Sequence, residues 1–172
     1  MSTVAAVIAV SLAQMLPMTN QPWKDVRNVI ETMSPAQLKL AFDLADGLNA
    51  KDCNIIEKQM ARFATLAAVN GPVEISGRIS HSKDSSLSDF VSDIQKIRSA
   101  NPALWRGKAS YEVQRVGDAS CLTVTKTDSV TGNTVIIVFS DKPTTVPVHG
   151  YGGVDTDAWR PEVIVVKSAL HR

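Results

Sequence analysis

The sequence predicts an α+β protein in which a helical N-terminal half, residues 1–100, precedes a small antiparallel β-sheet or sandwich in residues 101–172. Two observations support this fold class. Before residue 100, apolar residues recur every three or four positions, as on one face of a helix. After residue 109 they alternate or run consecutively, as in strands. The two regions are either separate domains or one continuous domain, since 172 residues suit both organisations.

Three helices are expected within residues 22–70. The second has the clearest start, because Ser34 can cap it and Pro35 suits its first turn. The third ends at the Asn70-Gly71-Pro72 sequence, which breaks helices.

A fourth helix is expected at about residues 86–100, after a serine-rich surface loop. Phe90, Ile94 and Ile97 share one of its faces, so this face should pack on the core. The Asn101-Pro102 sequence then ends the helix.

The alternating pattern after residue 109 predicts a hairpin of two antiparallel strands. Tyr111 and Val113 share one face of the first strand, and Leu122 and Val124 share one face of the second. The Gly117-Asp118 turn connects them.

The run from Val135 to Phe139 is apolar at every position, which is typical of a central strand covered on both faces. Pro143 and Pro147 confine residues 144–148 to an edge or an irregular segment, because proline donates no ladder hydrogen bond. Residues 163–166 form a last apolar strand.

The near balance of acidic and basic residues excludes a strong electrostatic field over the whole protein. Eighteen basic and 17 acidic residues leave a net charge of +1, so neither nucleic acid nor an anionic membrane is indicated as a partner. Residues 4–16 are apolar but too short and interrupted for a transmembrane helix. They resemble a secretory signal weakly, without its basic n-region. Cys53 and Cys121 form no metal or disulfide pattern, which favours a reducing, cytoplasmic compartment.

Several short sequences lie in the order found at one place in a known family. Ile94, Ile97 and Arg98 match the inner face of a helix, and Asn101-Pro102-Ala103-Leu104 followed by Gly107 matches its exit. Val135 to Phe139, with Ser140-Asp141-Lys142-Pro143 after it, matches a central strand and its turn. The stretch from Phe90 to Pro147 thus resembles the C-terminal end of α-amylase family glycoside hydrolases. There, the last barrel helix leads into an antiparallel β-sandwich.

The chain also departs from this family. The segment Gly71 to Gly77 is faintly similar to the eighth barrel strand, but Arg78 stands where an acid is expected. The three histidines lack the family's Asn-His-Asp signature. A complete barrel needs about 250 residues, so the resemblance implies a fragment or a degenerate relative. Glycoside hydrolysis also needs two carboxylates that face each other across the scissile bond, and no such pair can be assigned from this sequence.

Chemical candidates elsewhere have simpler interpretations. The sequence from Ser80 to Asp84 contains Ser, His, Lys and Asp, but a polar linker explains it better than a catalytic site. Cys53 is more typical of a small buried residue than of a reactive thiol. Asp155 and Asp157 lack the further oxygen ligands of a calcium site. We therefore expect no catalytic residue, metal site or cofactor, and the enzyme interpretation has no positive feature.

Aromatic residues in loop-like sequence are the remaining candidates. Tyr151 and Trp159 are expected to bind a ligand, by stacking on a sugar or a protein surface, whereas Trp105 should be a packed anchor. The sequence thus predicts a noncatalytic interaction or carbohydrate-binding module, with a protein partner or self-assembly and carbohydrate as a further ligand. The alternative is a structural subunit of a larger assembly, such as a viral or phage particle.

Overall fold

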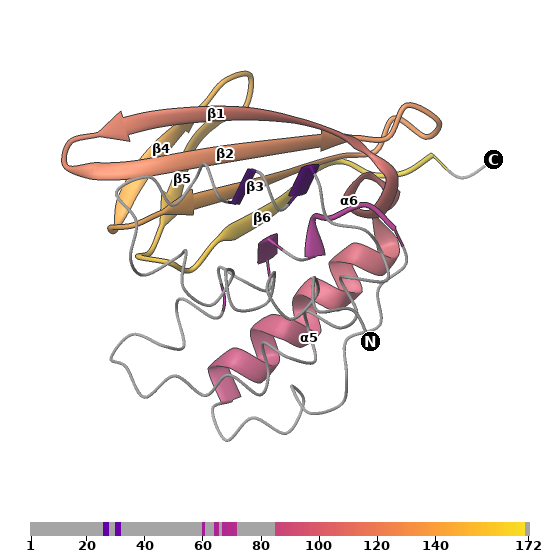
Figure 1. Cartoon of the computed structure of the whole chain (residues 1–172), viewed down its shortest axis with the longest axis horizontal. Coiled ribbons are helices and arrows are strands. Elements are labelled where there is room, and N and C mark those ends of the chain that lie inside the picture. Colours follow the sequence, from indigo (N-terminus) through magenta and orange to yellow (C-terminus); the bar gives the residue numbers. More distant parts are fainter. Residues whose placement is uncertain are drawn as a thin grey trace, which may run out of the picture.

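The computed structural model describes residues 26–27, 30–31, 60, 64–65, 67–71 and 85–170. Within the continuous stretch 85–170, two helices are followed by six strands (Figure 1). The elements are α5 (Ser85–Ala100), α6 (Pro102–Arg106), β1 (Lys108–Val116), β2 (Ala119–Thr127), β3 (Thr134–Ser140), β4 (Thr144–Val148), β5 (Gly152–Thr156) and β6 (Glu162–Lys167).

The strands form two antiparallel sheets. The larger sheet has the order β1-β2-β3-β6, and β4 and β5 form a separate two-stranded sheet (Figure 1). The β1–β2 connection turns at Gly117, whose φ of 62° favours glycine. The predicted hairpin of two strands is confirmed, and its register pairs Tyr111 with Val124 and Val113 with Leu122.

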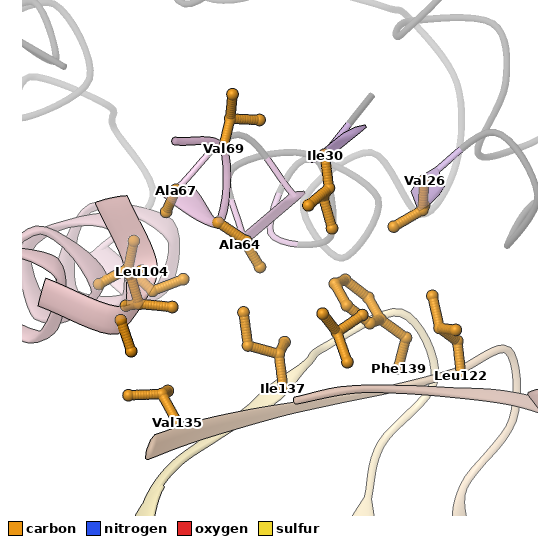
Figure 2. Packing of buried hydrophobic residues seen from close by; sticks show 14 of the residues in the cluster. Val26, Ile30, Ala64, Ala67, Val69, Leu104, Leu122, Val135, Ile137 and Phe139 are labelled. Atoms are coloured by element: carbon orange, nitrogen blue, oxygen red, sulfur yellow. The ribbon is translucent and has the colours of Figure 1, made fainter. Parts of the chain in front are cut away.

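Strand β3 is the centre of the fold because side chains cover both of its faces. Val135, Ile137 and Phe139 face a cluster formed with α6 and with residues before α5, as Figure 2 shows. Ile136 and Val138 face the β4–β5 sheet on the opposite side. We call these two sides of the larger sheet the helix side and the hairpin side. The prediction of a central strand covered on both faces is confirmed.

The helix predicted at residues 86–100 is confirmed as α5, whose Ile94 is buried in the helix-side cluster. The Asn101-Pro102 sequence ends α5 as predicted, and it also begins α6, which was not predicted. Pro102 occupies the first helical position, where its absent N–H leaves no hydrogen bond unmade. Residues 144–148, predicted to be an edge or an irregular segment, form the strand β4, whose only described ladder partner is β5.

The predicted fold class is wrong. The described part is mostly antiparallel β-sheet with two short helices, and no helical N-terminal half is shown. Helical backbone before α5 is described at residues 26–27, 30–31, 60, 64–65 and 67, whereas residues 68–70 form a turn and a bend. The rest of the three predicted helices lies outside the described residues. Helical spacing of apolar residues predicts only a local conformation. The described architecture follows from the ladders after Gly107, where nearly every residue joins a strand or a tight turn.

No helix within the described residues has the length and apolar character needed to cross a membrane.

Candidate functional site

Two buried cations hold residues 67–71 against α6 and the larger sheet. Lys126 lies on β2 and is 1% exposed, and Arg98 lies near the end of α5 and is also buried. Among the described residues, neither has a carboxylate within ion-pair distance. Their partners are backbone carbonyls and one amide oxygen, so both side chains link segments that are distant in sequence by hydrogen bonds.

Lys126 uses all three N–H groups of its ammonium. The Nζ atom donates to the carbonyl of Ala68 at 2.6 Å, to the carbonyl of Leu104 at 2.9 Å and to Oδ1 of Asn70 at 2.5 Å. Saturated donors make a charged, buried lysine tolerable, because each lost water contact is replaced. This geometry describes an anchor and leaves no N–H for a further acceptor.

Arg98, which lies on α5, binds the same segment. Its guanidinium donates to the carbonyls of Ala67 and Gly71, and to those of Val69 at 2.9 Å and Leu104 at 3.3 Å. Arg98 and Lys126 therefore share the carbonyl of Leu104. The two cations together fix residues 67–71 to α5 and to the larger sheet.

Burial of these groups shifts their protonation equilibria. Burial, with a smaller contribution from the charge of Arg98, lowers the pKa of Lys126 from 10.5 to about 7. Burial also lowers the pKa of Arg98 to about 10. Both side chains therefore lose their proton at a lower pH than an exposed lysine or arginine does.

A cavity of about 320 Å³ lies beside Lys126, with Ile30, Glu31, Asn70 and Tyr111 among its lining residues. The Tyr111 hydroxyl is buried and has no hydrogen-bond partner among the described residues. Burial, with a smaller contribution from Glu31, raises the pKa of Tyr111 to about 12. The hydroxyl is therefore protonated and can donate a hydrogen bond to a water molecule or another small polar group in the cavity.

The predicted ligand-binding residues Tyr151 and Trp159 are not brought together. Tyr151 lies between β4 and β5, in the turn of the hairpin that covers one side of the larger sheet, and is 48% exposed. Trp159 packs instead on the helix-side cluster and is only partly exposed. Its φ of 62° and the donation of its backbone N–H to the carbonyl of Ser140 at 2.8 Å fix this inward position. The two rings thus do not form one binding platform.

The structure describes only some of the other residues that the sequence offers for chemistry. Asp155 lies on β5 and accepts a hydrogen bond from the Thr145 hydroxyl at 2.5 Å. No group of three potential metal ligands occurs among the described residues. Cys121 is a buried free thiol whose Sγ lies 3.6 Å from the Ser140 hydroxyl, and burial raises its pKa. The candidates Cys53 and Ser80 to Asp84 lie outside the described residues.

The edge strand β6 has the features of an interaction site. It lies at the end of the larger sheet and has no neighbour on its outer side among the described strands. The four residues between Glu162 and Lys167 are all apolar, and Val165 and Val166 are 41% and 46% exposed. An exposed apolar strand edge readily pairs with another extended segment.

The opposite edge of the same sheet is protected. Strand β1 carries Lys108, Glu112 and Arg115 along its length. Charged side chains on an edge strand discourage pairing with another chain. The two edges of one sheet therefore differ, and only β6 presents an uncharged central stretch.

The register between β3 and β6 contains a β-bulge. Val165 pairs with Val135, whereas Lys167 pairs with Thr134, so Val166 is the extra residue. The bulge moves Lys167 into the ladder position that directly follows Val165.

No protein-family model, curated protein or solved structure matches this chain. The resemblance to α-amylase family proteins therefore stays a prediction.

The sequence contains a signal for the buried Lys126 and only part of the signal for the β6 edge, and neither was predicted. Lys126 continues the alternation of Leu122 and Val124 on β2, which places it on the inward face. A cation at an inward position indicates a group that must find internal acceptors. The β6 edge differs from the β1 edge by its four consecutive uncharged residues, but sequence alone does not indicate which strands lie at the edges.

Proposed function

We propose that this chain is a noncatalytic interaction module that binds an extended protein segment along the outer edge of β6. One observation carries the proposal. On its outer side β6 has no ladder partner among the described strands. Val165 and Val166 are exposed there, and no charged residue lies between Glu162 and Lys167. A bound segment would add one strand to the larger sheet, with main-chain hydrogen bonds supplying affinity and the valines supplying an apolar contact.

The test uses a probe unrelated to the chain itself. A fluorescent peptide of alternating threonine and valine, with a charged tail for solubility, is titrated with the protein while anisotropy is recorded. We expect saturable binding that Val165→Lys abolishes, because a lysine at the edge opposes strand addition.

The matched control is Val113→Lys on β1, since Val113 is also an exposed valine on an edge strand, at 66% exposure. This variant should bind the peptide as the wild type does. Absence of binding at about 1 mM, or equal loss in both variants, would contradict the proposal.

Carbohydrate binding is a second candidate, favoured by the exposed ring of Tyr151 in the β4–β5 turn. Aromatic rings of this kind match the apolar faces of sugars. Titration with maltooligosaccharides should then show saturable binding that Tyr151→Ala removes. Retention of binding in that variant, or no binding at millimolar sugar, would reject this candidate.

A further inference from the structure

We propose that the segment bound at the β6 edge is β6 of a second copy, so that two larger sheets join into one eight-stranded antiparallel sheet about a twofold axis. The inference rests on the proposed function, because it uses the same edge and names its partner. It follows from the charge pattern and register of β6.

The charges of β6 lie at its two ends and on one side of the sheet. Glu162 pairs with Val138, and Lys167 pairs with Thr134. Val138 belongs to the hairpin-side cluster, and Thr134 has the same parity on β3. Glu162 and Lys167 therefore both occupy hairpin-side positions.

An antiparallel pair brings these opposite charges together. A twofold axis perpendicular to the sheet reverses the strand and preserves its faces. With the axis at Ile164, the bulge at Val166 makes Lys167 of one copy directly oppose Glu162 of the other. The symmetry produces this ion pair twice, whereas a parallel pairing would oppose glutamate with glutamate and lysine with lysine.

The same register also pairs the apolar residues. Val163 of one copy opposes Val165 of the other on the helix side, and Ile164 opposes its own copy on the hairpin side. Such cross-strand pairs are the unit of sheet stabilisation. The pairing covers Val165, which the single chain leaves 41% exposed. Charge and apolar patterns thus agree on one axis position.

Sedimentation velocity across a concentration series tests the proposal with the full chain. The wild type should change from 18.5 kDa to twice that mass as concentration rises. Glu162→Lys and Lys167→Glu should each raise the dimer dissociation constant at least about tenfold, because each replaces two attractive pairs with two repulsive ones. The double variant E162K/K167E should restore dimerisation, since it exchanges the charges. Lys142→Glu is the control for a charge reversal away from β6.

Three results would overturn the inference. The first is a wild type that stays monomeric up to about 100 μM. The second is a dimer that neither single reversal weakens. The third is a particle much larger than a dimer, because a twofold pairing closes after two copies. The threonine–valine peptide separates the outcomes: peptide binding without self-association rejects the second copy and retains the proposed function, whereas failure of both rejects the edge itself.

Discussion

The buried ammonium of Lys126 gives the chain a testable dependence of stability on pH. The variant Lys126→Met removes the charge and keeps an unbranched side chain of similar length. It leaves the carbonyl of Ala68 and Oδ1 of Asn70 without their lysine donor, whereas the Leu104 carbonyl still accepts from Arg98. An orphaned buried acceptor costs about 1–3 kcal/mol, so the variant should be less stable near neutral pH.

The pKa of Lys126 fixes the sign and size of the pH effect. Burial lowers it from 10.5 to about 7, so between these values the unfolded chain holds a proton that the folded chain has released. The free energy of unfolding therefore rises with pH above 7 and falls as pH drops through this range. From pH 7 to pH 9 the wild type should gain about 2 kcal/mol from this residue, allowing for half-protonation at the lower pH.

Urea unfolding at both pH values, in the presence of a reductant, measures this gain. The difference in stability between wild type and Lys126→Met should grow by about 2 kcal/mol between pH 7 and pH 9. The control is Lys142→Met, because Lys142 is exposed and its hydrogen bond to Asp118 raises its pKa above 10.5. That residue keeps its proton over the whole range, so its variant should show no such growth. A constant difference for Lys126→Met would refute the reasoning, because the three hydrogen bonds would then retain the proton against burial.

Three further predictions concern the fold. Phe139→Ala should lower the free energy of unfolding by about 3–5 kcal/mol, because the ring is buried in the helix-side cluster; an unchanged urea midpoint would show that β3 is peripheral. Gly107→Ala should also destabilise the protein, since a Cβ there would lie 2.3 Å from the Ala103 carbonyl oxygen, and a melting temperature equal to the wild type's would contradict this close approach. The Arg106 guanidinium holds the pKa of Asp128 well below its usual range, so wild-type stability should fall as pH drops below about 4 and Asp128→Asn should lose less in an acid titration.

The strands were predictable because their signals are local. Five consecutive apolar residues identified β3, and the alternation around Gly117 identified the β1–β2 hairpin. Pro147 indicated that residues 144–148 do not form a central strand, and β4 indeed lies outside the larger sheet. These inferences need only the alternation of side chains along an extended strand, the turn preference of glycine and the missing N–H of proline.

The remaining features depend on contacts between distant residues. The Asn101-Pro102 sequence predicts only the end of a helix, whereas Pro102 also begins α6, because a proline fits both the residue after one helix and the first turn of the next. Trp159 was expected in an exposed loop, but its left-handed backbone turns it towards the core. Asn133 joins Asn101, the backbone of Ala103 and that of Lys167, which no spacing in the sequence indicates.

Hydrogen–deuterium exchange of β6 tests the central claim most directly. The protein is exchanged at a dilute and at a concentrated condition, and the amides of β6 and β1 are followed by mass spectrometry. Pairing of β6 between two copies predicts that exchange in Glu162–Lys167 slows at high concentration, whereas the amides of β1 exchange at the same rate in both conditions. Equal exchange of β6 at both concentrations, or new protection on β1, would contradict it.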